Sequence, residues 1–208
     1  TALSFALERL KDGLCDRILY LTGKTTGQNE VVRTLDKMIP DDCGFRYLCL
    51  RNRTERNIGF EDLEHLSEQE LARRWKSAAL NPLALFQGGT ISEKNLIESA
   101  KHAGIPPYEI IRACLPFAEL WIGDFNYVFQ PRSASTFGTV EGFAPIRSLL
   151  IVDEAHNLPE RVASGLSARF AFDDAAQATE HLLFAQAPKG LIRALGDWVE
   201  FLNTRRQN

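Results

Sequence analysis

Apolar positions in the first forty residues recur at helical and strand-like spacings in turn. Leucines share one face of a predicted N-terminal helix at Leu3, Leu7 and Leu10. The apolar run Arg17–Thr22 (RILYLT) follows and predicts a buried parallel strand. After a predicted turn, GKTTGQ, apolar residues between Val31 and Ile39 predict a second amphipathic helix, which Pro40 ends. Helix, strand, turn and helix in this order are typical of a parallel α/β sheet.

The segment from Asp41 to His102 has a different pattern, with many charges and no second strand of that kind. Ser67 stands three residues before Glu70, which is the spacing of a capping box at a helix start. Ser92 is placed to cap another short helix. The pattern therefore predicts a small helical insertion in this segment.

Sheet-like patterning returns after the insertion. A helix is predicted at Pro107–Leu115 and a strand at Ala118–Asp124. A Ser/Thr/Gly-rich loop, Arg132–Gly142, leads to the most hydrophobic strand, Ser148–Val152, which we expect to be buried. From Pro159 onward the apolar spacing is helical. The sequence thus predicts an α/β fold with a parallel sheet and mostly helical insertions.

Composition narrows the classes of function without naming one. The chain has 208 residues, of which 45% are hydrophobic, and a net charge of −3. This balance excludes a global basic field, so any nucleic-acid contact must use a local surface. No apolar run is long enough to span a bilayer, and the N-terminal residues lack the features of a signal peptide, so we expect no membrane partner and a cytoplasmic location.

Two adjacent carboxylates, Asp153 and Glu154, follow the strand Ser148–Val152 directly. Ligands bind at the carboxyl ends of strands in open α/β sheets. In nucleoside triphosphatases an aspartate there helps hold magnesium, and the next acid is placed to act as a general base on water. Because neighbouring side chains alternate in a pleat, both acids serve one site only if the strand ends between them. The alternative is that the pair caps a following helix, Ala155–Val162.

The stretch Leu21–Gln28 (LTGKTTGQ) looks like the end of a phosphate-binding loop. A GxxxxGK[ST] loop ending at Thr25 requires glycine at position 18, which is Ile18. That motif occurs nowhere in the sequence. The stretch is therefore not read as the triphosphate loop.

The string IVDEAHNL resembles motif II of the superfamily 2 helicases, in particular the XPD- and DinG-like branch. LTGKTTGQ is similar to motif Ia of that branch, and Trp121–Pro131 is similar to its segment leading towards motif II. Pro107–Glu109 resembles the helix start that follows the last iron–sulfur cysteine. These matches cover most of residues 1–165 in the family's order.

The resemblance implies a RecA-like first motor domain with two insertions, divided into four segments. These are residues 1–40 and 107–163 of the motor domain, a helical insertion at 41–106 in the iron–sulfur position, and the start of an Arch-like insertion at 164–208. The family's order places a phosphate loop before Thr1 and a second motor domain after the chain. We therefore expect this chain to be part of a helicase, inactive by itself.

The resemblance also implies roles for individual residues. Asp153 would help hold magnesium with ATP, Glu154 would activate water, and His156 would couple the nucleotide site to the second motor domain. Backbone phosphates of single-stranded DNA would be contacted on a different side of the sheet from these carboxylates, by Thr22, Lys24, Thr25 and Thr26. The alternative for that segment is a solvated glycine-rich turn.

Further DNA contacts are open to a second interpretation. Asn126 and Tyr127, in a predicted polar-aromatic loop, would stack on bases, although aromatic residues at this spacing are more often core. Basic residues of the insertion would guide single-stranded DNA, or form a solvated helix face: Arg51, Arg53, Arg56, Arg73, Arg74 and Lys76.

The cysteines depart from the family pattern. A cluster needs four converging thiolates, and the insertion contains only Cys43 and Cys49, whereas Cys15 and Cys114 lie outside the expected positions. We predict no iron–sulfur cluster. The favoured function is ATP- and magnesium-dependent translocation on single-stranded DNA, 5′ to 3′. The alternative is a non-catalytic module that binds nucleic acid or a protein partner and keeps the fold.

Overall fold

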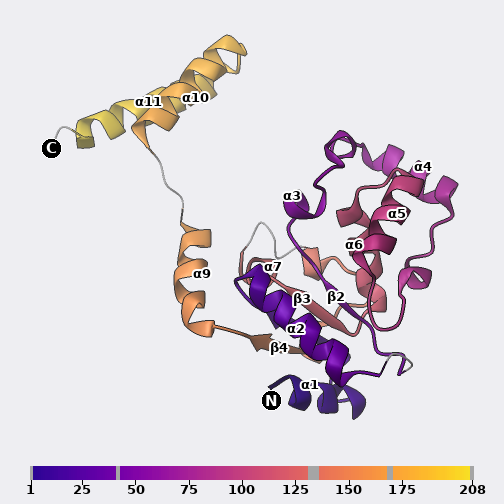
Figure 1. The fold of residues 1–208 in the computed structure, drawn as a ribbon. Coiled ribbons are helices and arrows are strands. Elements are labelled where there is room, and N and C mark those ends of the chain that lie inside the picture. Colours follow the sequence, from indigo (N-terminus) through magenta and orange to yellow (C-terminus); the bar gives the residue numbers. More distant parts are fainter. Residues whose placement is uncertain (1, 41–42, 131–135, 168–170, 207–208) are drawn as a thin grey trace. The chain divides into compact units, whose positions relative to one another are not determined.

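In the computed structural model, which describes residues 2–40, 43–130, 136–167 and 171–206, a single parallel sheet organises most of the chain (Figure 1). Its strands within these residues are β1 (Arg17–Leu21), β2 (Tyr47–Cys49), β3 (Leu120–Gly123) and β4 (Ser148–Val152). They lie in the order β2-β3-β1-β4. Leu21 pairs with Gly123 on one side and with Val152 on the other, so the carboxyl ends of β1, β3 and β4 are level. The predicted α/β class with a parallel sheet is confirmed.

Strand β2 lies in the segment for which the sequence predicts no strand, so that expectation is wrong. Only three residues form it, and they pair with β3 alone, at one edge of the sheet. Arg46 anchors the start of β2, because its backbone N–H and its guanidinium both donate to the Glu119 carboxylate, at 2.7 and 2.8 Å. A strand this short, bounded by charges, is specified by its pairing with β3 and leaves no periodic signal of its own.

Strand β4 also differs from expectation, since none of its residues is fully buried. Leu150 is 42% exposed, and β4 is an edge strand of the sheet formed by the described residues. An apolar run specifies that a strand has hydrophobic side chains on both faces, but it does not specify how many neighbours the strand has. The predicted position of β4 is therefore right, and its predicted burial is wrong.

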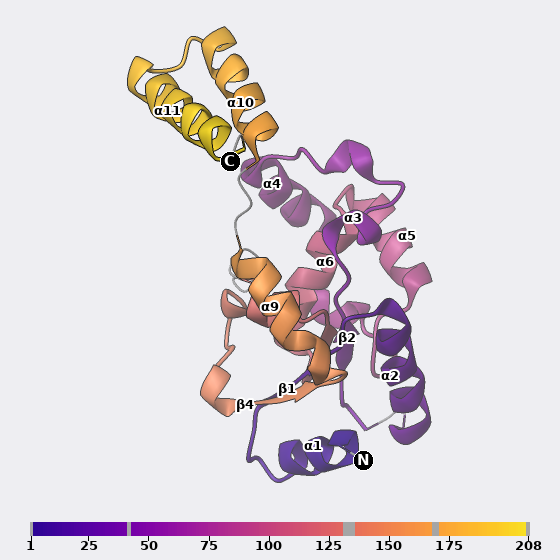
Figure 2. The same ribbon diagram turned by 90° about the vertical axis from the view of Figure 1, so that its left-hand side faces the viewer.

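Helices cover both faces of the sheet, as Figures 1 and 2 show. On one face, α1 (Ala2–Lys11) and α2 (Thr25–Met38) pack on side chains that include Ile18, Leu120 and Ile122. On the other face, α6 (Pro107–Cys114) packs on alternate residues of the same strands, including Leu19 and Trp121. The alternation of the pleat thus divides the core between two layers of helices.

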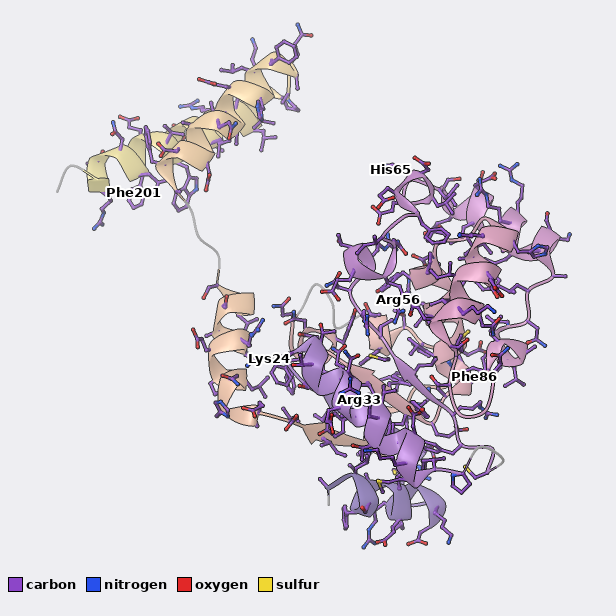
Figure 3. The ribbon with its side chains drawn as sticks, in the orientation of Figure 1. Lys24, Arg33, Arg56, His65, Phe86 and Phe201 are labelled. Carbon is purple, nitrogen blue, oxygen red and sulfur yellow. The ribbon has the colours of Figure 1, made fainter. Side chains whose placement is uncertain are left out.

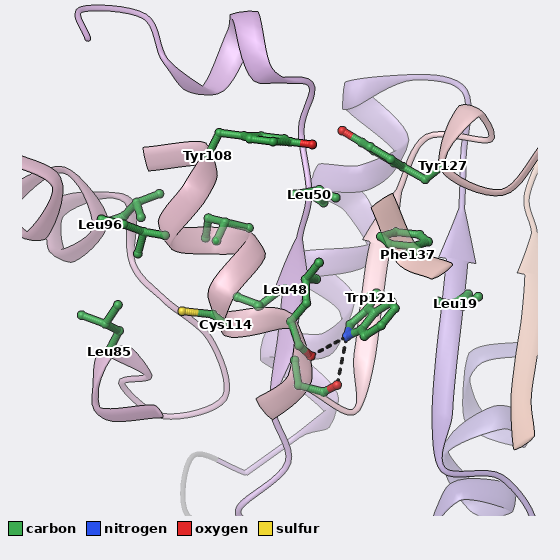
Figure 4. Packing of buried hydrophobic residues seen from close by; sticks show 14 of the residues in the cluster. Leu19, Leu48, Leu50, Leu85, Leu96, Tyr108, Cys114, Trp121, Tyr127 and Phe137 are labelled. Carbon is green, nitrogen blue, oxygen red and sulfur yellow. Dashed lines mark hydrogen bonds between the residues drawn. The ribbon is translucent and has the colours of Figure 1, made fainter. Parts of the chain in front are cut away.

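Trp121 lies at the centre of the larger core cluster (Figure 4). Its side chain is fully buried, and its indole Nε1 donates to the carbonyls of Leu115 and Ala118 at 2.9 and 3.1 Å. The guanidinium of Arg17 lies 4.2 Å from the ring centroid, and the Phe137 ring lies 4.9 Å from it. The polar edge of the indole is therefore satisfied while its faces are packed.

Short helices fill the segment between β2 and α6, where the sequence predicts a helical insertion. They are α3 (Arg53–Arg56), α4 (Glu68–Ala78) and α5 (Glu93–Ala103), with 3₁₀ turns at Glu61–Leu63 and Pro82–Leu85. The Ser67 hydroxyl accepts from the Glu70 N–H at 3.2 Å, and the Ser92 hydroxyl accepts from the Asn95 N–H at 3.1 Å. Both predicted N-caps are confirmed.

The chain divides into two compact units, Thr1–Gly165 and Leu166–Asn208. The first unit includes all but the last residue of α9 (Leu158–Leu166), which follows β4. In the second, α10 (Phe172–Phe184) and α11 (Lys189–Arg206) pack against each other. Within α11, the rings of Trp198 and Phe201 lie edge to face. The predicted domain boundaries stay predictions, because compactness alone does not identify an Arch-like insertion. Within the described residues, no helix is both long and apolar enough to cross a bilayer.

Candidate functional site

A cavity of about 700 Å³ opens at the carboxyl ends of β1 and β4. Residues of the Thr22–Gly27 segment line one part of it, and residues between Asp153 and Ser164 line another. Phe125, just after β3, completes the lining. Because β1 and β4 are parallel neighbours in register, segments 130 residues apart in sequence meet at this edge.

The acidic pair begins where β4 ends. The Asp153 backbone N–H donates to the Leu21 carbonyl at 2.8 Å, which fixes Asp153 beside the end of β1. One carboxylate oxygen of Asp153, Oδ1, accepts from the Glu154 backbone N–H at 3.1 Å. Asp153 is half-buried and Glu154 is exposed, so the two carboxylates have different environments within one cavity.

Glu154 has a left-handed backbone, with φ +53° and ψ 40°. This conformation is costly for a residue with a side chain and concentrates at functional sites. From the sequence, both acids can serve one site only if the strand no longer sets their directions. This condition is met, because β4 has ended by Asp153, so the alternation of the pleat does not determine where the Glu154 side chain points. The Glu154 carboxylate lies 3.3 Å from Nε2 of His156, so these two predicted site residues are in contact.

The predicted turn GKTTGQ is largely helical. Helix α2 begins at Thr25, and Lys24 is its extended N-cap residue without a side-chain cap. Figure 3 shows Lys24 at this N-terminal end of α2. The sequence predicts a turn here because glycine is common in turns. Gly27 instead lies inside the first turn of α2, where it packs on Thr22. The N-terminal amides of α2 therefore face the end of the sheet, an arrangement that favours anions.

Two glycines of this segment allow close packing. A Cβ at Gly27 would lie 2.5 Å from the Thr22 hydroxyl oxygen, and a Cβ at Gly23 would lie 3.0 Å from the Phe125 ring. Glycine at 27 is thus required by space, against the helix propensity that favours alanine.

Replacing Gly27 with alanine is expected to destabilise the chain by about 1–3 kcal/mol, since the new methyl group displaces the buried Thr22 side chain. The matched control is Gly196→Ala in α11, where no atom lies within 4 Å of the added Cβ. There alanine is expected to add about 0.5–1 kcal/mol of stability through helix propensity. Urea unfolding curves measure both, and equal effects of the two substitutions would contradict the packing argument.

The predicted phosphate-contacting residues differ in exposure and in whether they line the cavity. Lys24 and Thr26 are exposed and line the cavity, Thr22 lines it although it is only 2% exposed, and Thr25 is exposed but does not line it. The resemblance places Lys24 on a different side of the sheet from the acidic pair. Lys24 nevertheless lines the same cavity as Asp153 and Glu154, and its contact with DNA stays a prediction.

Asn126 and Tyr127 belong to a short helix, α7 (Asn126–Phe129), and not to a loop. The Tyr127 side chain is 7% exposed and packs on Phe137, with ring centroids 5.2 Å apart. Burial also raises the pKa of the Tyr127 hydroxyl. The ring is therefore a core element in this conformation, as the second interpretation of the sequence has it, and is not offered to a base. Among the described residues, the Asn126 side-chain oxygen is buried without a partner.

The basic residues of the insertion are mostly paired. Arg53 pairs with Glu109, Arg56 pairs with Glu93 at 2.7 Å, and Arg73 and Arg74 both pair with Glu70. The Arg51 guanidinium donates to Asn29 at 3.0 Å. These contacts favour a structural role for the charges over a continuous track for nucleic acid.

Seven residues of the cavity lining were not predicted as site residues. Three of them are Gly23, Gly27 and Phe125, and the other four follow the DEAH string: Asn157, Glu160, Arg161 and Ser164. The last three have a signal in the sequence, because spacings of three and four put Glu160, Arg161 and Ser164 on one face of α9, whereas Asn157 ends the 3₁₀ turn before it. In the sequence analysis, this helix is considered only as the helix that follows the acidic pair, and none of its residues is predicted to belong to the site.

The donor set at the strand end fits magnesium. Within the described part of the chain, no group of three His, Cys, Asp or Glu side chains is placed to hold a metal ion by itself. Magnesium, however, is usually held by one or two carboxylates together with substrate phosphates and waters. A half-buried Asp153 beside the exposed Glu154 meets that requirement.

The cysteines differ in exposure. Cys43 is exposed, Cys49 is half-buried, and Cys15 and Cys114 are buried. Burial raises the pKa of the Cys114 thiol to about 12, which keeps it protonated at neutral pH. The absence of an iron–sulfur cluster stays a prediction, which an iron assay on the purified protein tests.

Comparison with known families agrees with this geometry. The DEAD_2 family matches residues 44–174. That span contains three of the four strands and the DEAH string. No curated protein matches the chain. The parallel sheet is consistent with a RecA-like domain. The chain therefore belongs to the DEAD_2 family, the DEAD-like helicase domain of XPD/DinG-type helicases, which are ATP-dependent nucleic-acid motors.

Proposed function

We propose that the chain is part of a DNA helicase that couples magnesium-dependent ATP hydrolysis to movement along single-stranded DNA in the 5′ to 3′ direction. One observation carries the proposal. A single cavity joins the DEAH carboxylates to Lys24 and to the N-terminus of α2. The residues that act on the nucleotide and those that contact nucleic acid would thus lie next to each other, at the carboxyl ends of the adjacent strands β4 and β1.

In this proposal, Asp153 helps hold magnesium, and its position is fixed by the backbone hydrogen bond to Leu21. Bound magnesium would neutralise charge on the phosphates. Glu154 accepts a proton from the attacking water as a general base. Its exposed carboxylate and its position outside the pleat are both compatible with that role.

His156 is the coupling residue of the proposal. Its contact with the Glu154 carboxylate supports this, because a movement of the imidazole would alter the hydrogen bonding of the base. The partner that moves it would be the second motor domain of the same polypeptide. ATP itself would also need a phosphate loop supplied by that polypeptide.

The test uses the longest polypeptide that contains this chain. Single-stranded DNA is expected to stimulate its magnesium-dependent ATP hydrolysis, and a duplex with a 5′ single-stranded tail is expected to be unwound in preference to one with a 3′ tail. Binding to DNA without ATP hydrolysis would instead support the non-catalytic alternative. Unwinding of the 3′-tailed duplex alone would contradict the proposed direction.

A further inference from the structure

Two adjoining cavities form a groove along one face of α6, away from the DEAH carboxylates. The first has a volume of about 320 Å³ and lies among α3, α4 and α6, which Figure 1 shows together in this part of the chain. The second has a volume of about 290 Å³ and lies among α4, α6 and residues 139–141. Glu109 and Arg112 line both cavities, so the two form one continuous surface, here called the α6 groove. Its described lining shares no residue with the cavity at the ends of β1 and β4.

The length of the α6 groove follows from the helix that forms its floor. The residues that α6 and its two ends contribute recur at spacings of three and four, from Pro106 through Glu109 and Arg112 to Pro116. Ten residues at a rise of 1.5 Å per residue extend over about 15 Å. An extended peptide of about five residues has the same length.

Apolar side chains form the walls of the α6 groove, and each of them is half-buried: Leu63, Leu66, Leu71, Trp75 and Val140. Trp75 packs against the larger core cluster and also lines the groove. Its indole N–H makes no hydrogen bond to any described residue, whereas the indole of Trp121 donates to two carbonyls. Trp75 therefore offers a partner both an apolar surface and a hydrogen-bond donor, a combination that is enriched at protein interfaces.

The charge of the lining selects the kind of partner. Four carboxylates against two guanidinium groups leave an excess of two negative charges: Glu64, Glu68, Glu109 and Glu141 against Arg53 and Arg112. Both arginines already pair with Glu109. Glu68 and Glu141 are exposed, and in the described part of the chain neither makes an ion pair or a side-chain hydrogen bond. Such a surface attracts a cationic partner and repels the phosphates of nucleic acid.

We infer that the α6 groove binds a short, extended, basic segment of a partner protein. In an extended segment, successive side chains point to opposite sides, so apolar side chains can contact Leu71 and Trp75 while basic ones reach Glu68 and Glu141. The Trp75 indole donates to a backbone carbonyl of the segment. The inference is independent of the proposed function, because it concerns a surface that contains none of the residues given a role in ATP hydrolysis.

The probe is a short labelled peptide that alternates lysine and leucine, added to the purified chain. Fluorescence anisotropy measures its affinity, and ¹⁵N–¹H spectra locate the contact through the indole signals of the three tryptophans. The Trp75 signal, identified by its absence in Trp75→Phe, is expected to shift as peptide is added. The signal of the fully buried Trp121 is the internal control and is expected to stay in place.

Three variants test the chemistry of the contact. Glu68→Gln and Glu141→Gln are each expected to weaken binding roughly two- to fivefold and to reduce its dependence on salt. Trp75→Phe keeps a ring but loses the donor, and it is expected to weaken binding about fivefold or more. Glu98→Gln is the matched control, because this exposed carboxylate of α5 lines neither cavity, and affinity is expected to be unchanged.

The inference is overturned if the folded chain does not bind the peptide, or binds it without a shift of the Trp75 signal. Equal affinity for a peptide that alternates glutamate and leucine would refute the role of charge and overturn it as well. A shift of the Trp75 signal with oligothymidylate, and none with the peptide, would assign the groove to nucleic acid instead. Loss of ATP hydrolysis in the intact protein bears on the proposed function alone. Circular dichroism of each variant confirms that the fold is kept.

Discussion

Replacing Glu154 with glutamine in the intact protein is expected to lower DNA-stimulated ATP hydrolysis by roughly 10²–10⁴-fold, which is the usual contribution of a general base. Glutamine has nearly the same shape as glutamate, but its amide does not accept the proton that the attacking water loses. The substitution keeps a side chain at the left-handed position, so the backbone cost at this residue is unchanged. Affinity for DNA and for ATP is expected to stay near the wild-type value.

The measurement is steady-state ATP turnover with saturating single-stranded DNA, together with oligonucleotide binding on the same preparation. Glu98→Gln is the matched control, because Glu98 is an exposed carboxylate on α5. It removes the same charge far from the strand end and is expected to leave turnover unchanged. Unchanged turnover in Glu154→Gln would refute the role given to this residue, and an equal loss in Glu98→Gln would refute its specificity.

The strands β1, β3 and β4 were predictable because each carries an apolar run of strand length. The N-caps at Ser67 and Ser92 were predictable for a similar reason, since capping depends on residues only three positions apart. Strand β2 was not predictable, because its three residues are held by β3 and by the Arg46–Glu119 contacts. Local pattern therefore specifies a strand with a long apolar run, at the edge or in the interior, better than a three-residue strand held by its neighbour.

Some features of the candidate site were likewise predictable from local sequence, and others were not. The carboxylates at Asp153 and Glu154 follow from their place at the end of an apolar strand. Their proximity to Lys24 does not follow, because it depends on β1 and β4 being direct neighbours, which no local pattern encodes. The left-handed Glu154 is likewise a tertiary result, since glutamate has no intrinsic preference for that region.

The common edge of β1 and β4 has a consequence for coupling. Asp153 is tied to β1 through the Leu21 carbonyl, and Thr22 follows Leu21 directly, with its own N–H bonded to the Gly123 carbonyl. A shift of the carboxylate pair is therefore transmitted to the Thr22–Lys24 backbone through main-chain hydrogen bonds. Such bonds are rigid, so the two halves of the cavity are expected to respond together.

Replacing Trp121 with alanine is expected to give the largest loss of stability, about 3–5 kcal/mol in the free energy of unfolding. The indole is fully buried, so the substitution leaves a large cavity between the sheet and α6. It also removes the indole donor to the Leu115 and Ala118 carbonyls, of which the Leu115 carbonyl keeps other donors, and the ring on which Arg17 lies. Because domains are stable by only about 5–15 kcal/mol, this variant is expected to unfold at much lower urea concentration or to lack a cooperative transition.

Two further tryptophan variants keep this prediction testable if the alanine variant does not fold. Trp121→Phe retains an aromatic ring but loses the Nε1 donor. We expect a smaller cost of about 1–3 kcal/mol, because the Ala118 carbonyl loses the indole donor, whereas the Leu115 carbonyl still accepts from Arg17 and from the Ala118 N–H. Trp198→Ala is the matched control, since Trp198 is 48% exposed on α11, and we expect a cost below about 1 kcal/mol. Urea unfolding followed by far-ultraviolet circular dichroism ranks the three variants without relying on tryptophan emission. A midpoint for Trp121→Phe as high as that of Trp198→Ala would show that the indole hydrogen bonds contribute nothing, and would contradict the packing described for this core.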